Sequence, residues 1–222
     1  MWRWRSMLAL LLGSVVNSIA CRETVAIAYC HPENLLGECS YPVNWYQHGV
    51  AVSPRVFSAS SACGQCLKIF NVESRKVILA HIIGTCHECN GGEISLGPTT
   101  FKYLGAEGQL EMRVDWETAF CSDIKAPFSY HFKAGSTRRH AYLQILNNAL
   151  PIEALNYASR LGMDHDAFLT TDNYFELFDI GYRVNITLHA SLLEQKTREM
   201  SSVIYFRTNP GYFLSHSQFL PI

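Results

Sequence analysis

Apolar and polar residues alternate with a period of two along several stretches of the chain, which is the pattern of β-strands with one buried face. Residues 76–83 are rich in β-branched and apolar side chains, as in a strand that is mostly buried. Residues 109–116 read QLEMRVDW, and the apolar side chains that alternate there with polar ones are Leu110, Met112, Val114 and Trp116. We therefore predict two strands, the second with these four side chains on one face.

A loop and a short helix are predicted between these two strands. Pro98 suits the first position of a helix, where its missing N–H removes no hydrogen bond. Gly105 suits the left-handed conformation that often ends a helix. A further strand is predicted upstream, over residues 22–29.

The second half of the chain has the same period-two pattern. One run is formed by Phe128, Tyr130 and Phe132, and another by Tyr182, Val184, Ile186 and Leu188. Several short runs of this kind, separated by turn residues, favour a β-sandwich. The segment 122–127 between the halves is short and polar, and its final proline biases the preceding residue toward an extended conformation, so we interpret it as a linker.

Composition bounds the possible functions. The 222 residues, 48% of them apolar, are enough for two modest domains with real cores. The net charge of −1 gives no sign of a nucleic-acid partner. Residues 1–20 have the form of a secretory signal, with two arginines, an apolar run too short to span a membrane and the small-residue cleavage site Ser18-Ile19-Ala20. We therefore expect a secreted, extracellular protein that begins at Cys21 and has no membrane segment.

The cysteines all lie in the first part of the chain, and an even number in an exported protein predicts a disulfide framework made of Cys21, Cys30, Cys39, Cys63, Cys66, Cys86, Cys89 and Cys121. Four of them have the spacing C-x2-C-x19-C-x2-C, which is also that of a four-thiolate zinc site. We favour disulfides because thiolates oxidise outside the cell, and we expect no metal and no cofactor. The spacing leaves the pairing open.

Three motifs together resemble one protein family. CGQC at 63–66, HIIGTCHEC at 81–89 and EISLGPTTFKYLG at 93–105 are similar to the double-psi β-barrel of expansins and expansin-like proteins. Phe128 to Tyr130, the later DNYF at 172–175 and the ending SQF at 217–219 are similar in order to the second expansin domain, although this match is less specific. Together the two matches cover nearly all of the chain after residue 20.

The resemblance implies a mostly β protein. It implies a six-stranded double-psi β-barrel with short helices at 21–122, a linker at 123–127 and an immunoglobulin-like β-sandwich at 128–222. It also implies a disulfide between Cys66 and Cys121, which would tie the end of the first domain to the barrel. The implied function is non-hydrolytic loosening of cell-wall polysaccharide, with cellulose or a related glucan as the partner of a monomer.

The chain departs from the family at the polar groove positions. The two aspartates and the threonine of expansins correspond here to Ser95, Gly84 and, with a less certain alignment, Ile27. Glycoside hydrolysis needs two carboxylates that flank the bond, so we expect no hydrolysis. The alternative is a weak enzyme that uses Glu93 or Asp115, although these acids are more simply explained as solvated charges.

The chain also departs from the family at the aromatic row that stacks on sugar rings. The matching positions are Arg139, His140 and Asp172, with Tyr142 and Tyr174 nearby in sequence. Our candidate polysaccharide-binding residues are therefore Tyr41, Trp45, Glu93, Ser95, Arg139, His140, Tyr142, Asp172 and Tyr174. The second hypothesis is a protein-binding or protease-inhibitor module on the same scaffold, with contacts around Trp45, Tyr46 and Arg139. Asn185 lies in a glycosylation sequon on the polar side of a predicted strand.

Overall fold

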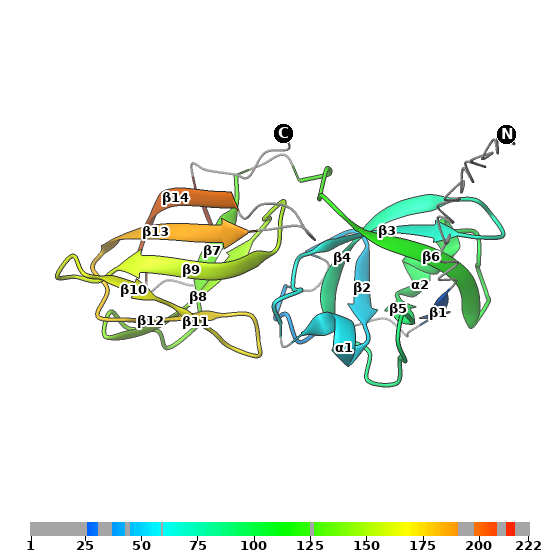
Figure 1. Ribbon diagram of the computed structural model, residues 1–222, viewed down its shortest axis with the longest axis horizontal. Helices are drawn as coiled ribbons and strands as arrows, with labels where there is room; N and C mark the ends of the chain where they lie inside the picture. The colour runs from blue at the N-terminus through cyan, green and yellow to red at the C-terminus, as the bar shows by residue number, and fades with distance from the viewer. Residues whose placement is uncertain are drawn as a thin grey trace, which may run out of the picture.

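The computed structural model describes residues 26–30, 37–42, 45–58, 60–124, 127–190, 198–207 and 212–215. The predicted signal at 1–20 and Cys21 lie outside these residues. Among the described helices, none is long and apolar enough to cross a membrane. Figure 1 shows two β-rich halves side by side along the longest axis, the N-terminal half a barrel and the C-terminal half two sheets.

Six strands close into the barrel in the order β1-β5-β2-β4-β3-β6. Their bounds are β1 Ala26–Cys30, β2 Gly49–Val52, β3 Cys66–Asn71, β4 Val77–Thr85, β5 Ile94–Leu96 and β6 Glu111–Ala119. The β1·β5 and β2·β4 pairs are parallel, and the other four pairs are antiparallel. The prediction of a mostly β chain with a closed six-stranded barrel is therefore confirmed at this level.

The local predictions around the barrel centre hold except at one residue. Helix α2 spans Pro98–Tyr103 with Pro98 in its first turn, and Gly105 follows it with a φ of +84°. A shorter helix, α1, spans Pro54–Phe57. Met112 and Val114 are buried on β6, as predicted, but the placement of Leu110 was wrong. Leu110 is 83% exposed because β6 begins only at Glu111, so the alternating pattern extends further than the strand.

Three disulfides staple the barrel: Cys39–Cys63, Cys66–Cys121 and Cys86–Cys89. The second is the pair that the family resemblance implied. Because Cys63 and Cys66 belong to different disulfides, the alternative of a four-thiolate zinc site is wrong. The framework is also smaller than predicted among the described residues, since Cys30 is a free, half-buried cysteine that packs against the barrel core.

The C-terminal half consists of two antiparallel sheets. The four-stranded sheet has the order β10-β9-β13-β14, and the five-stranded sheet has the order β11-β12-β8-β7-β15. The strands of the first are β9 Ile152–Ala158, β10 Asp164–Asp166, β13 Arg183–Ala190 and β14 Arg198–Tyr205. The strands of the second are β7 Ser129–Phe132, β8 His140–Leu146, β11 Phe168–Leu169, β12 Phe175–Phe178 and β15 Phe213–Leu214.

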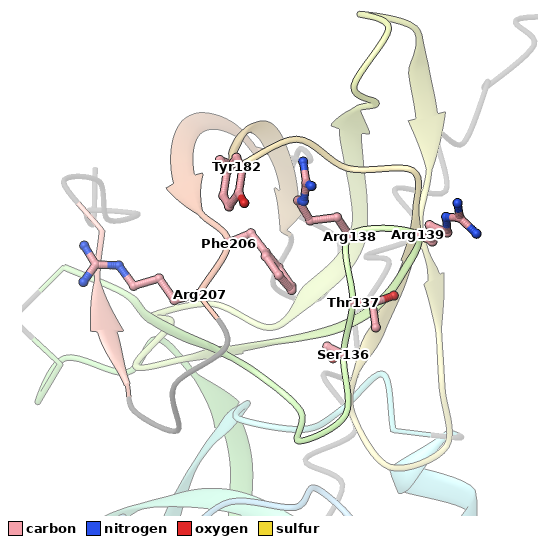
Figure 2. Close-up of a pocket in the computed structure, with 7 residues that line it drawn as sticks. All are labelled: Ser136, Thr137, Arg138, Arg139, Tyr182, Phe206 and Arg207. Atoms are coloured by element: carbon pink, nitrogen blue, oxygen red, sulfur yellow. The ribbon is translucent and has the colours of Figure 1, made fainter.

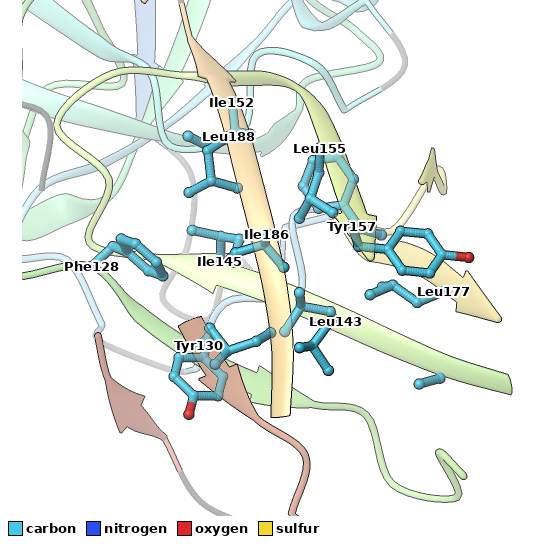
Figure 3. Packing of buried hydrophobic residues seen from close by; sticks show 14 of the residues in the cluster. Phe128, Tyr130, Leu143, Ile145, Ile152, Leu155, Tyr157, Leu177, Ile186 and Leu188 are labelled. Carbon is cyan, nitrogen blue, oxygen red and sulfur yellow. The ribbon is translucent and has the colours of Figure 1, made fainter. Parts of the chain in front are cut away.

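One hydrophobic core lies between these two sheets, as Figure 3 shows. Leu143 and Leu177 come from the five-stranded sheet, and Leu155 and Ile186 from the four-stranded one. Inward-facing residues alternate with polar ones, so the period-two pattern predicted the core positions of β7 and β13. Tyr182 is the exception: it precedes β13 and is 67% exposed.

The barrel and the five-stranded sheet meet at the backbone of Cys39. Its carbonyl oxygen accepts a hydrogen bond from Gln144 Nε2 at 2.8 Å and another from Asn173 Nδ2 at 3.0 Å, and all three residues are buried. Ser60 Oγ also donates to the carbonyl of Thr170 at 2.7 Å. Polar groups removed from water in this way must be paired, so the contact fixes one docking geometry between the two halves.

A buried histidine lies near this junction. His81 on β4 is 2% exposed, and its ring stacks on Tyr46 with the ring centroids 3.9 Å apart. Its Nε2 lies 3.7 Å from Asp123 Oδ1 and has no hydrogen-bond partner among the described residues. Burial lowers the pKa of His81 to about 4, because removal from water disfavours the charged ring more than the nearby Asp123 carboxylate favours it.

This histidine predicts acid sensitivity. The folded-state pKa of His81 lies below its unfolded value, so the unfolded chain binds more protons and stability falls as the pH drops from about 6.5 toward about 4. Between about pH 7 and pH 4.5 we expect His81 to contribute a loss of roughly 2 kcal/mol in the free energy of unfolding. Urea titrations at the two pH values should show a smaller loss for His81→Phe, which keeps a ring against Tyr46.

The matched control for this prediction is His165→Phe, because His165 is exposed on β10. Equal acid losses in the wild type and in His81→Phe would contradict the prediction.

Candidate functional site

An exposed surface with several aromatic rings covers part of the five-stranded sheet, on the side away from the core. We call it the outer face and define it by Lys133, His140, Tyr142, Glu176 and Phe178. Residues directly opposite one another on antiparallel strands share a face, and Phe178 pairs with His140 while Glu176 pairs with Tyr142. The alternate residues of these strands point into the core, so this register places His140, Tyr142, Glu176 and Phe178 together. Lys133 Nζ lies 5.8 Å from the centroid of the Tyr142 ring.

The rings of the outer face are in contact. His140 stacks on Phe178 with a centroid distance of 4.7 Å and an interplanar angle of 12°, and it lies 4.7 Å from Tyr142 at an angle of 47°. Phe178 is 51% exposed. Phe168, opposite Glu176 on β11, adds another exposed ring on the same side of the sheet. Phe168 and Phe178 are exposed and His140 and Tyr142 are half-buried, so the rings present apolar surface to solvent.

Charged groups lie among these rings. His140 Nε2 lies 2.5 Å from Glu176 Oε1, and Lys133 Nζ lies 2.7 Å from Asp172 Oδ2. Partial burial raises the pKa of Asp172, but hydrogen bonds from Lys133 and Thr170 outweigh it and the net effect is a lowered pKa. Burial and the neighbouring Glu176 raise the pKa of Tyr142, so its hydroxyl keeps its proton and remains a donor. The surface thus combines flat apolar rings with fixed donors and acceptors.

A second line of rings runs from this face to the barrel. The Tyr174 hydroxyl lies 3.3 Å from His131 Nε2, and Lys133 Nζ lies 4.9 Å from the centroid of the Tyr174 ring. Tyr174 itself is buried, and burial raises its pKa to about 12. His131 contacts Tyr212 at a centroid distance of 4.7 Å, and Tyr212 contacts Trp45 of the barrel at 4.8 Å. This line marks the border between the open outer face and the barrel.

The structure brings four of the predicted site residues together: His140, Tyr142, Asp172 and Tyr174. Trp45 lies at the barrel end of the line of rings, with its Nε1 donating to Asn147 Oδ1 at 3.1 Å. Tyr41 packs edge-on against Tyr46, at a centroid distance of 5.1 Å, and burial strongly raises the pKa of its hydroxyl. Tyr41 is therefore part of the junction between the halves rather than of an open surface.

Two further predicted site residues lie on the barrel, Ser95 on β5 and Glu93 just before this strand. Ser95 is 1% exposed, and in the strand register it lies between Tyr29 and Ala51, which pack against the Cys86–Cys89 disulfide. The Glu93 carboxylate accepts the Tyr29 hydroxyl at 3.3 Å and the Asn90 backbone N–H at 2.7 Å. Glu93 thus holds a turn in place, and Ser95 is closed off from solvent.

Gly84, which the family resemblance matches to a groove aspartate, is closed by a neighbouring segment. A Cβ on Gly84 would lie 2.6 Å from the Cα of Gly37 and 2.6 Å from Glu38 Oε2. Glu38 is held there because its Oε2 accepts the backbone N–H of Thr85 at 2.6 Å and its Oε1 lies 3.3 Å from His87 Nε2. Glycine at position 84 is therefore required by the chain that crosses it.

Arg139 faces a different surface from its neighbour His140. It lines a pocket of about 690 Å³ together with Arg138 and Arg207, at the open end of the two sheets (Figure 2). Asn185 is exposed on β13, as its sequon requires. Asp115, the alternative acid considered in the sequence, is exposed on β6.

The candidate binding residues chosen from the sequence did not include Phe178, Lys133 or Glu176. The run FELF at 175–178 begins with alternation, but Phe178 is apolar and falls on the same face as Glu176, so the pattern does not place it. The register of β12 against β8 does, because Phe178 lies opposite His140. A charged residue within the run, Glu176, was the available signal for the exposed face.

Comparison with known proteins gives matches at the level of structure. No protein-family model matches the chain, and no curated protein matches it in sequence. Among solved structures, the apo form of an expansin from Clavibacter michiganensis superposes with a TM-score of 0.75 at 20% identity, and the match covers 89% of this chain and 98% of that one.

A point mutant of the same expansin, in complex with cellohexaose, matches with the same TM-score, identity and coverage. The match takes in both the barrel and the two sheets, since it spans nearly the whole of both chains. The chain therefore has the expansin fold, in agreement with the resemblance that its sequence motifs indicated.

Proposed function

We propose that this is a secreted, expansin-like protein that binds cell-wall polysaccharide on the outer face of the five-stranded sheet and loosens it without hydrolysis. The observation that carries the proposal is the contact of His140 with both Phe178 and Tyr142 on an exposed surface. The similar expansin in complex with cellohexaose supports a glucan as the ligand class. The three disulfides support an extracellular location.

The proposed mechanism is competition for the contacts of a glucan chain. Phe178, His140 and Tyr142 offer ring faces for the apolar faces of sugars, and Lys133 and Glu176 offer charged hydrogen-bond partners for hydroxyls. A chain bound in this way exchanges contacts with its neighbouring chains for contacts with the protein. No covalent bond needs to form or break, so the surface does not need a catalytic acid.

We further propose the domain division 21–122, 123–127 and 128–222, with the first domain a double-psi barrel and the second an immunoglobulin-like sandwich. The shared core between the two sheets supports the second assignment. The proposal of a non-hydrolytic protein is supported by the groove positions, because Ser95 is buried, Gly84 is closed and Glu93 is engaged in a turn.

Restoring an acid at the groove should damage the fold. In Gly84→Asp the new Cβ would meet the backbone of Gly37, and its charge would lie beside Glu38. We expect a loss of about 2 kcal/mol or more in the free energy of unfolding, measured by urea titration. Gly92→Asp is the control, since the nearest atom to its new Cβ is the Ala26 Cβ at 3.8 Å. A Gly84→Asp protein as stable as this control would show that the crossing segment is not fixed.

The outer face should account for glucan binding. Phe178→Ala and Tyr142→Ala each remove a ring, so we expect each to weaken binding to insoluble cellulose roughly fivefold or more. Depletion isotherms on cellulose measure the affinity, and circular dichroism checks the fold. Tyr205→Ala is the matched control, because Tyr205 is 49% exposed on β14 of the other sheet.

Two results would overturn the proposed function. One is wild-type affinity in both outer-face variants, which would place the binding surface elsewhere. The other is no retention of the wild-type protein on cellulose or on the related wall polymers chitin and peptidoglycan at low salt. That second result would favour the protein-binding module that the sequence also allows.

A further inference from the structure

We propose that the pocket at the open end of the two sheets is an anion site, and that it takes an acidic group carried by a polysaccharide. The pocket has a volume of about 690 Å³ and is lined by Ser136, Thr137, Arg138, Arg139, Tyr182, Phe206 and Arg207. Figure 2 shows Arg138 beside the ring of Tyr182, Phe206 between Arg138 and Arg207, and the side chain of Arg139 directed away from these rings. This inference rests on the proposed function, because it concerns the class of wall polymer that the protein binds.

The backbone around the pocket is held in place by hydrogen bonds from neighbouring segments. The N–H of Ile180 donates to the carbonyl of Arg138 at 2.8 Å, and the N–H of Asp179 donates to the carbonyl of Arg139 at 3.1 Å. The N–H of Phe206 donates to the carbonyl of Tyr182 at 2.8 Å. Arg138 and Arg139 therefore project from hydrogen-bonded backbone, and Arg207 directly follows the hydrogen-bonded Phe206.

Two of the arginine side chains rest on aromatic rings. The Arg138 guanidinium carbon lies 4.3 Å from the centroid of Tyr182, and that of Arg207 lies 4.9 Å from the centroid of Phe213. Stacking uses the flat face of a guanidinium and leaves the N–H groups of its edge free to donate. Such an edge matches the two oxygens of a carboxylate or a sulfate.

These arginines have no acidic partner within the described part of the chain. The carboxylates along the same strands are engaged elsewhere, Glu176 with His140 and Asp179 with Arg160 at 3.4 Å. Arg138 and Arg207 lie beside the aromatic rings of the pocket, and Arg139 is directed away from them. In a chain of net charge −1 these arginines are a local excess of positive charge that an anion would relieve. The buried ring of Phe206 and the exposed ring of Tyr182 give the pocket apolar surface as well, which suits the body of a sugar better than a free inorganic ion.

The pocket is linked through the chain to the outer face. Arg139 and His140 are adjacent in sequence, and the Ser136 hydroxyl accepts the backbone N–H of Tyr142 at 3.0 Å. A polymer with both neutral and acidic sugars would therefore find ring faces on one surface and cations on the next. The acidic group is a uronate carboxylate or a sulfate ester, and the two share the chemistry that the arginines recognise.

The test uses the full-length protein and three polymers: polygalacturonate, the same polymer with its carboxylates methyl-esterified, and dextran sulfate. Binding is measured by affinity electrophoresis at fixed salt. The pocket variant is the double substitution Arg138→Gln with Arg207→Gln. The control is Arg75→Gln with Arg113→Gln, which removes the same charge from exposed barrel positions.

We expect polygalacturonate to bind the wild-type protein, esterification to abolish that binding, and the pocket variant to lose roughly tenfold in affinity while the control loses less than about twofold. If only dextran sulfate binds the wild-type protein and loses affinity in the pocket variant, the anion site is supported and the acidic group is a sulfate. Equal losses in the pocket and control variants would overturn the proposal, since the effect would then be one of net charge. So would unchanged binding in the pocket variant.

The pocket variant must also retain wild-type binding to cellulose, which shows that it is folded. This arm separates the two proposals. If the pocket variant loses binding to polygalacturonate but keeps binding to cellulose, the pocket proposal is supported. If the wild-type protein binds polygalacturonate through these arginines but does not bind cellulose, the outer-face proposal is wrong and the pocket proposal still holds.

Discussion

The arrangement of the molecule depends on one carbonyl oxygen, that of Cys39. Its residue is tied to the barrel by the Cys39–Cys63 disulfide and by its N–H, which donates to the carbonyl of Ile83 at 3.2 Å. On the other side the oxygen accepts two buried amide groups, from Gln144 and Asn173. A buried carbonyl without a hydrogen-bond partner costs about 1–3 kcal/mol of folding free energy. If the halves separated from this contact while it stayed buried, the amide groups of Gln144 and Asn173 would also lose their partner. The two halves are therefore held in one relative position rather than joined only by a linker.

The same docking decides which surfaces remain available. Gln144 lies on the outer side of β8, and its contact with Cys39 covers that part of the sheet. His140 and Tyr142, four and two residues earlier on the same strand, lie beyond this contact. The segment that carries Cys39 also crosses Gly84 through Gly37 and Glu38. One segment thus joins the halves and also covers part of the barrel surface.

The sequence predicted the parts of this structure that local patterns determine. Alternation placed Met112, Val114 and the core side of β13, and Pro98 and Gly105 marked the ends of α2. The alternation predicted the wrong environment for Leu110 and Tyr182. Both residues continue the alternating pattern but lie just before the first residue of their strand, and no local signal marks where the strand begins. Contacts between distant residues carry no such pattern: Gln144 and Cys39 are 105 residues apart, and a buried glutamine in a strand looks like any outward polar residue. The family resemblance, rather than the spacing, indicated Cys66–Cys121.

The pair Arg139 and His140 separates the two surfaces that we propose for ligand binding. Neighbouring residues at the start of a strand point in different directions, so Arg139 and His140 contribute to different surfaces. His140 stacks on Phe178 of the neighbouring strand β12, so the apolar patch spans both strands. Arg139 instead adds charge beside Arg138 and Arg207. In our proposals the surface that carries His140 contacts a neutral glucan, and the arginine pocket extends recognition to acidic sugars.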